Sequence, residues 1–226
     1  MSWILQIHTA LETASVSIAF DGKLVAEKMN TSQKDHASFL HPSIVELLAI
    51  ATISIKQIDA IAVVNGPGSY TGLRVGMASA KGLCYALNKP LITIGSLQIM
   101  AAAAIKQLDK NDESILYCPM IDARRMEVFT AVYDKHMSIF IAACAIELSE
   151  DLFVNYMLNK KMYFFGDGTQ KWRTICSNKN ADFITVENNS MIVSALAYQS
   201  FKTNKFASLA YSEPTYLKDF FSPLNS

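Results

Sequence analysis

The sequence has no net charge, because its 20 lysine and arginine residues equal its 20 aspartate and glutamate residues. A chain without an overall positive field does not attract nucleic acid or an anionic membrane by long-range electrostatics. A role with nucleic acid would therefore need a local basic patch or a basic partner. Charged residues make up only 18% of the chain and the mean hydropathy is +0.20. We expect another subunit to cover part of the apolar surface.

The sequence also lacks closely spaced cysteines, a cationic leader and a long apolar run. Cys84, Cys118, Cys144 and Cys176 lie 34, 26 and 32 residues apart, which excludes a CxxC zinc site and a compact disulfide framework. We interpret them as buried thiols in a reducing compartment. The longest unbroken apolar stretch, residues 139–146, is far shorter than the roughly 18 residues of a membrane span. The sequence predicts a soluble, cytoplasmic protein without a membrane partner.

The 226 residues suffice for one domain or two small lobes. Alternating apolar residues predict strands at 4–7, 14–20 and 23–29, with a hairpin-turn signal, Asp-Gly, between the last two. A helical period follows over 35–51, where Pro42 indicates either a kink or a helix that begins near His41. The same reasoning predicts a strand at 58–64, a helix at 71–87, a strand at 91–94 and a helix at 97–108. The predicted order is βββ-α-β-α-β-α.

A polar segment at residues 106–114 indicates a boundary between two parts of the chain. We predict a first lobe over residues 1–108 and a second, reduced lobe over residues 109–226. The second part resembles a shortened copy of the first. Its predicted strands lie near 115–121, 127–133, 138–143 and 162–165, and its predicted helices near 150–158 and 191–201. The fold class is α/β.

The most specific stretch is residues 65–76, with the sequence NGPGSYTGLRVG. Gly66 and Gly68 allow a sharp turn from a strand into a helix, which Ser69 or Thr71 can cap. Such a turn directs backbone N–H groups at an anion above the sheet, so one interpretation is a phosphate-facing loop. The other, which the spacing alone favours, is a tight turn with close helix packing. The stretch is neither a Walker A loop nor GxGxxG, because its third glycine comes one position late.

The predicted helix at 71–87 carries small residues on two neighbouring faces. One face holds Gly72, Gly76, Ser79 and Leu83, and the next holds Val75, Ser79, Gly82 and Ala86. Small residues let another backbone come close, either that of the sheet below or that of a partner helix. A further amphipathic side, which we expect to face outward, holds Tyr70, Arg74, Met77 and Lys81.

Five segments resemble, in order and over nearly the whole chain, the TsaB (YeaZ) family. They are ILQIHT at 4–9 with ASVS at 14–17, HASFLHP at 36–42, the loop at 66–76, IDARRMEV at 121–128, and EPTYL at 213–217. The loop is highly specific to the family, and the others are strong in combination. The resemblance implies an actin/sugar-kinase/Hsp70-like (ribonuclease H-like) fold with two related lobes, the second one reduced. That fold agrees with the predicted element order.

The resemblance also implies a role in making N6-threonylcarbamoyladenosine at position 37 of tRNAs that read codons beginning with A. Proteins of this family do not catalyse the transfer. They bind the catalytic paralogue TsaD, the ATPase TsaE joins the complex, and tRNA is reached through it. The resemblance implies that this chain needs no cofactor itself, and that the subunit boundary of the complex is a place where ATP or ADP could bind. Alone, such proteins form homodimers through the helices that correspond here to 35–51 and 71–87. The candidate interface residues are His36, Leu40, Ile44, Tyr70, Arg74, Val75, Met77, Ala80 and Lys81.

His8 departs from the family pattern, in which an aspartate follows the first strand and, in the wider fold, helps to hold a metal–nucleotide. A histidine can be neutral at pH 7 and does not replace the charge of a carboxylate. Asp122 stands where the fold has a second phosphate-side aspartate, and Gly-Asp-Gly at 166–168 resembles a remnant of a nucleoside-side loop. We interpret these positions as a vestigial nucleotide side, made of His8, Gly66, Gly68, Ser69, Asp122, Gly166 and Gly168.

The alternative is an enzyme that acts alone, as a glycoprotease-like peptidase or a small-molecule kinase. His36 and His41 are five residues apart, about 140° around a helix, so they do not form a metal pair, and we predict no metal site. Ser69 does not lie in a GxSxG motif. A kinase needs a metal-binding carboxylate and a base, and His8 argues against the first. Together with what the family resemblance implies, these departures predict a non-catalytic scaffold subunit.

Overall fold

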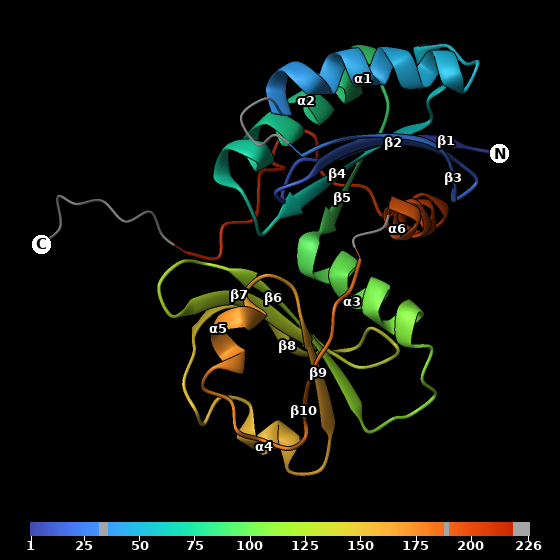
Figure 1. The fold of residues 1–226 in the computed structure, drawn as a ribbon. Coiled ribbons are helices and arrows are strands. Elements are labelled where there is room, and N and C mark those ends of the chain that lie inside the picture. The colour runs from blue at the N-terminus through green and yellow to red at the C-terminus, as the bar shows by residue number, and fades with distance from the viewer. Residues whose placement is uncertain (32–35, 188–189, 219–226) are drawn as a thin grey trace, which may run out of the picture. The chain divides into compact units, whose positions relative to one another are not determined.

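The structure is a computed structural model that describes residues 1–31, 36–187 and 190–218, with the side chain of His36 left out (Figure 1). The chain forms two compact units, Met1–Ile99 with Asn188–Pro214, and Met100–Glu187 with Thr215–Ser226. This division differs from the expected boundary between residues 108 and 109. The last helix belongs to the first unit because it packs on the first sheet, and the division falls inside the helix that precedes residue 109.

The first unit contains a five-stranded sheet in the order β3-β2-β1-β4-β5. Its strands are β1 (Trp3–His8), β2 (Ala14–Phe20), β3 (Lys23–Asn30), β4 (Ala60–Gly66) and β5 (Leu91–Gly95). The first three strands pair antiparallel, while β1, β4 and β5 run parallel. Asp21 and Gly22 both have positive φ, 46° and 77°, as the tight hairpin turn requires. The predicted meander and hairpin are confirmed.

Helices cover both faces of this sheet (Figure 1). Helices α1 (His36–Ile50) and α2 (Tyr70–Leu87) pack on one face, and α6 (Ser190–Lys202) packs on the other, against β1, β3 and β5. Helix α3 (Ser96–Leu108) follows β5, and a short 3-10 turn, η2 (Ile55–Gln57), precedes β4. Helix α1 continues through Pro42, whose ring is exposed, so a start near His41 is wrong.

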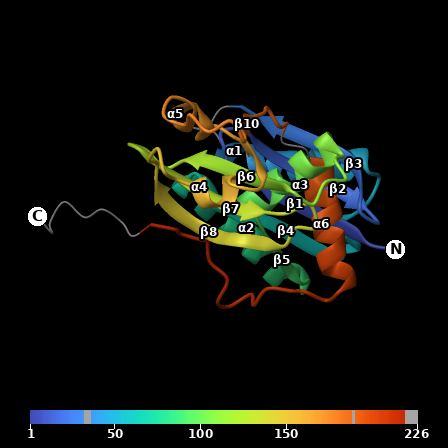
Figure 2. The ribbon, with the colours of Figure 1, turned by 90° about the horizontal axis from the view of Figure 1, so that it is seen from below.

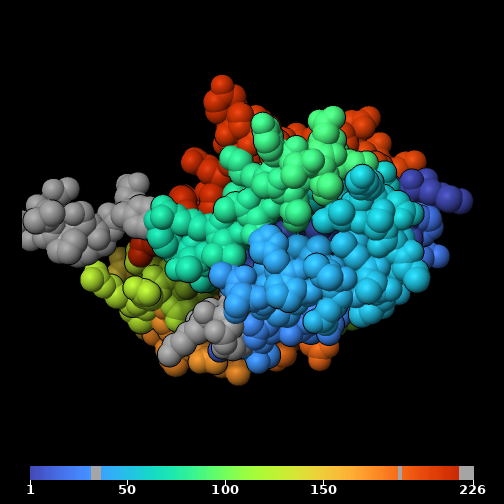
Figure 3. Space-filling model, turned by 90° about the horizontal axis from the view of Figure 1, so that it is seen from above, coloured from blue at the N-terminus to red at the C-terminus, as the bar shows by residue number. Residues whose placement is uncertain are grey.

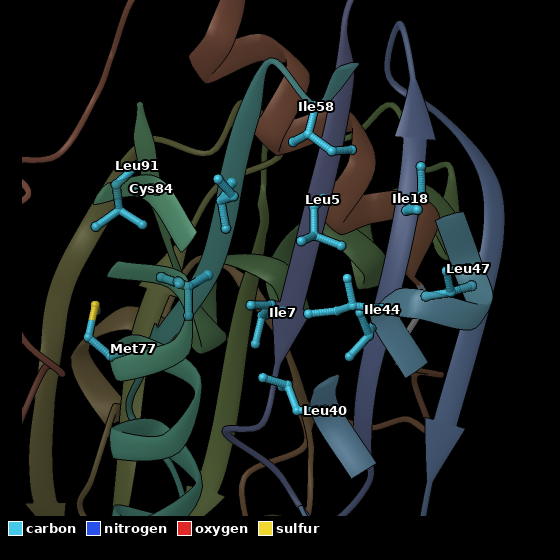
Figure 4. Close-up of a cluster of buried hydrophobic side chains, with 14 residues drawn as sticks. Leu5, Ile7, Ile18, Leu40, Ile44, Leu47, Ile58, Met77, Cys84 and Leu91 are labelled. Carbon is cyan, nitrogen blue, oxygen red and sulfur yellow. The ribbon is translucent and has the colours of Figure 1, made fainter. Parts of the chain in front are cut away.

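The core of the first unit lies between the sheet and the pair α1 and α2 (Figure 4). Alternate strand residues such as Leu5, Ile7 and Ile18 point toward the helices, because successive side chains in a strand face opposite sides. They meet Leu47 of α1 and Cys84 of α2, which are also buried. Residues that recur at the 3.6-residue helical period therefore form one side of the core. Alternate residues of the strands form the other side.

The second unit repeats the architecture of the first. Its sheet has the order β10-β9-β6-β7-β8, formed by β6 (Ile115–Asp122), β7 (Glu127–Tyr133), β8 (Ile139–Glu147), β9 (Lys161–Phe165) and β10 (Ala181–Phe183). Strands β6, β7 and β8 lie next to one another and form an antiparallel meander (Figure 2). Strands β6, β9 and β10 run parallel. The core contains Trp172, Phe164 and Phe153. A three-strand meander followed by two parallel strands is thus present twice.

The helices of the second unit are much shorter than those of the first. Helix α4 (Val154–Met157) stands where the sequence predicts a helix over 150–158, and it starts late because Phe153 adopts a left-handed backbone conformation. Helix α5 (Thr169–Arg173) and strand β10 were not predicted, since five and three residues carry almost no periodicity. The predicted reduction of the second part is confirmed. In residues 1–31, 36–187 and 190–218 no helix has the length and apolarity to cross a membrane.

Candidate functional site

The inward sides of α1 and α2 hold several of the predicted interface residues. Leu40 and Ile44 of α1, and Met77 and Ala80 of α2, are buried against the sheet (Figure 4). The expectation that Met77 faces outward is wrong, because Met77 belongs to the buried stripe that runs from Leu73 to Cys84 at helical spacing. These four side chains therefore pack the helices onto the sheet and are not accessible to a partner protein.

The outward sides of α1 and α2 form a surface that we call the α1–α2 face. Its exposed residues, read from the two helices, are Ala37, Ser38, His41, Pro42, Val45, Glu46, Ala49, Ile50, Tyr70, Thr71, Arg74, Ala78, Gly82, Tyr85 and Ala86. The helices lie side by side (Figure 3). The imidazole Nε2 of His41 is 3.5 Å from Ser79 Oγ. Only Glu46 and Arg74 are charged, and Glu46 pairs with Lys28. The face is therefore mostly small and apolar.

Three large apolar side chains stand out on the α1–α2 face. Val45 is 68% exposed, Ile50 59% and Tyr85 83%. None of the three is among the predicted interface residues. On α2 the prediction gives the outward role to the side with Met77 instead of Tyr85, and on α1 it names Leu40 and Ile44, which are buried. The signal that could have found Tyr85 was the small-residue face, since Gly82 and Ala86 lie beside it. A Cβ added at Gly82 meets nothing within 4 Å, so the surface there is open.

The remaining interface candidates are only partly available. The Arg74 guanidinium stacks over the Tyr70 ring at 4.0 Å, and both residues are exposed. Val75 is half-buried. Lys81 donates from Nζ to the carbonyls of Ala210 and Ser212, at 3.3 and 2.9 Å, and so ties the C-terminal part of the first unit to α2. The side chain of His36 lies outside the described residues.

The glycine-rich loop between β4 and α2 packs against the segment that follows β1. A Cβ at Gly68 would lie 2.0 Å from the Ala10 carbonyl oxygen, and a Cβ at Gly72 2.0 Å from that of Thr9. Ser69 donates its N–H to the Ala10 carbonyl at 2.7 Å, and its Oγ accepts from Gly72 N–H at 3.3 Å to cap α2. These donors already have partners within the chain. The geometry is that of close packing rather than an open phosphate cradle.

Gly66 lies at the start of this loop with a φ of 111°, a value that favours glycine. Farther along, a Cβ at Gly76 would lie 2.3 Å from Thr9 Oγ1, which itself donates to the Gly72 carbonyl at 2.6 Å. The spacing of glycines from 66 to 76 therefore lets α2 seat directly on the end of β1. The glycines on the inward face of α2 therefore allow close packing against the sheet, which is one of the two roles that the sequence allows for small residues on this helix.

His8 closes β1 and is only 7% exposed. Its Nε2 is buried and has no hydrogen-bond partner among the described residues. Burial lowers the pKa of the imidazole from 6.5 to about 4, so His8 is neutral near pH 7. A neutral buried imidazole does not supply the charge by which a carboxylate holds a metal–nucleotide.

The second unit carries its own counterpart of this arrangement at the end of β6. The Asp122 carboxylate accepts from Lys171 Nζ at 2.8 Å and from Arg124 N–H at 2.6 Å, and the Lys171 bond is the main reason that the pKa of Asp122 is lowered. A Cβ at Gly166 would lie 2.3 Å from the Met120 carbonyl, and one at Gly168 would lie 2.9 Å from Val128. The Gly166–Gly168 turn follows β9 as the other glycine loop follows β4. In each unit, the glycines of this turn therefore allow the chain to pack closely against a neighbouring segment.

No metal cluster appears in the part of the chain that the structure describes, where no three His, Cys, Asp or Glu side chains converge. The four cysteines are free thiols. The positions predicted as a vestigial nucleotide side thus divide into two sets, one in each unit. Ser69 in the first set and Asp122 in the second already bond to the chain, whereas the Nε2 of His8 has no hydrogen-bond partner among the described residues.

Comparison with known proteins places the chain in a family. The family model described as TsaD, tRNA N6-adenosine threonylcarbamoyltransferase, matches residues 24–220. The chain is 28% identical to the tRNA threonylcarbamoyladenosine biosynthesis protein TsaB of Escherichia coli (strain K12), over 96% of this chain and 94% of that protein. It is 32% identical to the protein of the same name from Bacillus subtilis (strain 168), over 58% of this chain and 54% of that one.

Solved structures show the same fold. A Pseudomonas aeruginosa protein described as similar to peptidase YEAZ has a TM-score of 0.79 at 22% identity, covering 96% of this chain and all of that one. A polyphosphate/ATP-glucomannokinase from Arthrobacter sp. strain KM has a TM-score of 0.50 at 10% identity, over 89% of this chain and 100% of that one. With the repeated strand order, these likenesses confirm the α/β actin/sugar-kinase-like fold. The family match over residues 24–220 and the TsaB relatives together show that the chain belongs to the TsaD family and, within it, to the TsaB (YeaZ) group.

Proposed function

We propose that this chain acts in tRNA threonylcarbamoyladenosine biosynthesis as a non-catalytic subunit that binds a TsaD-like catalytic protein. Relatives that share most of its length carry the name of that pathway. The observation that carries the proposal is the α1–α2 face, a small and apolar surface on an otherwise ordinary α/β unit. An exposed apolar patch of this kind marks an interaction site.

The residues that would have to perform chemistry support a non-catalytic role. His8 is neutral and buried where a kinase-like site needs a carboxylate. The glycine loop donates its Ser69 N–H to the chain's own Ala10 carbonyl, and Asp122 is bound by Lys171. A protein that lost its catalytic groups and kept an apolar helix face is best explained as a binding subunit. It would need no cofactor of its own, with ATP or ADP bound at the subunit boundary of the complex.

The α1–α2 face has the composition of a protein–protein contact. A stable interface buries about 800 Å² on each partner, and aromatic side chains in its centre contribute most of the affinity. Tyr85 supplies such an aromatic side chain, while Val45 and Ile50 supply apolar area around it. The small residues Ala78, Gly82 and Ala86 allow a partner helix to approach closely. The same surface would serve a homodimer, which the TsaD-like partner would displace. A TsaE-like ATPase and tRNA would join through that partner.

Sedimentation velocity tests the proposal with the full chain, alone and mixed with the TsaD-like protein of the same organism. We expect a homodimer that converts to a one-to-one heterodimer. Gly82→Arg and Val45→Glu place bulk or charge on the α1–α2 face without touching the core, and both should weaken each assembly at least tenfold. The matched control is Leu158→Glu, which adds the same charge at a side chain 66% exposed in the second unit.

Two outcomes would overturn the proposal. One is a chain that stays monomeric and ignores the TsaD-like protein. The other is an assembly that Leu158→Glu disrupts while Gly82→Arg and Val45→Glu do not. Either result would favour the alternative of an enzyme that acts alone, which ATP binding and turnover by the isolated chain would test. Circular dichroism of each variant shows whether the fold survives, so that loss of binding is not confused with unfolding.

A further inference from the structure

Residues 206–214, which we call the C-terminal strap, follow α6 and belong to the first unit. Ala207 donates its N–H to the Leu91 carbonyl at 2.8 Å, so the strap begins along the outer edge of β5. Leu209 packs against the core of the first unit. Backbone and side-chain contacts therefore hold the strap on the first unit.

Helix α2 holds the middle of the strap through Lys81. The Lys81 ammonium donates to the carbonyls of Ala210 and Ser212, at 3.3 and 2.9 Å, and these two residues flank Tyr211. Among the described residues, no aromatic side chain is more exposed than Tyr211, at 88%. The lysine thus fixes the backbone on both sides of an aromatic ring that the chain itself leaves uncovered.

The C-terminal strap continues the α1–α2 face on the side of α2 away from α1. Ser79 marks the side of α2 that meets α1, because its Oγ lies 3.5 Å from the His41 imidazole. Lys81 comes two residues later, about 200° around the helix, so the strap lies along the opposite flank. Figure 3 shows this flank, with residues coloured red beside α2. Tyr85 lies one turn beyond Lys81, which places two exposed tyrosines, Tyr85 and Tyr211, around one lysine.

A contact outside the two helices would give a TsaD-like partner an advantage over a second copy of this chain. Under the proposed function both bind the α1–α2 face, and the TsaD-like protein displaces the second copy. Displacement at equal concentrations needs a difference in affinity. A tyrosine that becomes buried at an interface can supply a difference of about tenfold or more. Because the strap is already held in place, burial of Tyr211 orders one side chain and no backbone segment.

We infer that Tyr211 is the contact that favours the TsaD-like protein over a second copy, and that Lys81 is a positioning residue that holds it in place. The inference rests on the proposed function and adds to it the residue that sets the choice of partner. The matching feature on the TsaD-like protein is an apolar pocket with a hydrogen-bond acceptor for the tyrosine hydroxyl.

Two dissociation constants of the full chain test the inference. Sedimentation equilibrium gives that of the homodimer, and fluorescence anisotropy gives that of the complex with the TsaD-like protein of the same organism. Tyr211→Ala should weaken the complex about tenfold and the homodimer less than about twofold. The matched control is Phe140→Ala, at an aromatic side chain 43% exposed in the second unit, which should change neither.

Variants of Lys81 separate positioning from direct contact. Lys81→Met should weaken the complex at least about threefold in the native chain and much less in the Tyr211→Ala background, because the lysine acts through the tyrosine. Lys81→Arg keeps donors for both carbonyls and should restore binding. An equal effect of Lys81→Met in both backgrounds would overturn the positioning role.

The results distinguish this inference from the proposed function on which it rests. If Val45→Glu blocks the complex and Tyr211→Ala does not, or if Tyr211→Ala weakens both assemblies equally, the inference is overturned and the proposed function stands. A chain that binds the TsaD-like protein but forms no homodimer also overturns the inference, because no second copy competes. If the native chain forms no complex, both fail.

Discussion

The buried imidazole of His8 should make the first unit acid-sensitive. In the folded chain, burial lowers the pKa of His8 to about 4 from the ordinary 6.5. The unfolded chain therefore takes up a proton as the pH falls below 6.5, and the folded chain does not until about pH 4. The stabilising contribution is complete above pH 6.5 and is lost as the pH falls between these values.

The size of the effect follows from the difference between the two pKa values. One pKa unit corresponds to about 1.4 kcal/mol, so the full loss is about 3 kcal/mol, of which about 2.5 kcal/mol is lost between pH 7.5 and pH 4.5. That is a large share of the stability of an ordinary domain, about 5–15 kcal/mol.

Hydrogen exchange under native conditions measures this loss in each unit separately. The free energy of opening is taken from amides of β1 and β2, and those of β6 and β9 in the other unit serve as the internal reference. His8→Gln should reduce the loss between pH 7.5 and 4.5 by about 2 kcal/mol or more in β1 and β2. His136→Gln, at an exposed histidine, should not. An equal pH dependence of β1 in the native protein and in His8→Gln would refute the assignment.

Three further predictions concern stability and packing. Gly72→Ala should destabilise the first unit by about 1–3 kcal/mol in urea unfolding, because its Cβ would overlap a backbone carbonyl at 2.0 Å. Gly82→Ala, in open space on the same helix, should stabilise it by about 0.5–1 kcal/mol. Equal effects of the two substitutions would contradict the packing role of the loop. Met77→Glu places a charge where the native side chain is only 4% exposed, so it should unfold the first unit. Val45→Glu, at an exposed position, should change the free energy of unfolding by no more than about 0.5 kcal/mol. A folded Met77→Glu protein would show that this face of α2 does not pack on the sheet. Lys81→Met removes the ammonium that binds two carbonyls of the segment after α6, so limited proteolysis should cut residues 206–214 faster; unchanged cutting would show that the lysine does not hold that segment.

The sequence predicts the first unit well because its elements are long and strongly patterned. The strands of the meander alternate, the Asp-Gly turn is specific, and α1 and α2 each extend over four or more turns. In the second unit, α5 and β10 contain five and three residues, too few to establish a period. Helix α6 has a clear helical pattern, yet its assignment to the first sheet depends on pairs such as Gln6 with Ser194, which are 188 residues apart.

The interface residues could be predicted only in part. The sequence shows that α2 has several faces, but hydropathy does not decide which of them meets the sheet. Met77 was expected outside because it follows Tyr70 and Arg74, and it is inside because the Leu73–Cys84 stripe is the more apolar one. The role of the inward glycines depends on carbonyl oxygens of residues 9 and 10, which no local pattern reveals. The sequence identifies His8 as a position without a carboxylate, whereas its burial depends on how the strands of the first sheet pair.

Binding of a TsaD-like subunit to the α1–α2 face can be tested by hydrogen exchange of the chain with and without a stoichiometric amount of that protein. We expect slower exchange in α1 and α2, centred on peptides that contain Val45 and Tyr85, and no change in β8 of the second unit. Protection confined to the second unit, or no protection at a concentration where the two proteins sediment together, would contradict the claim.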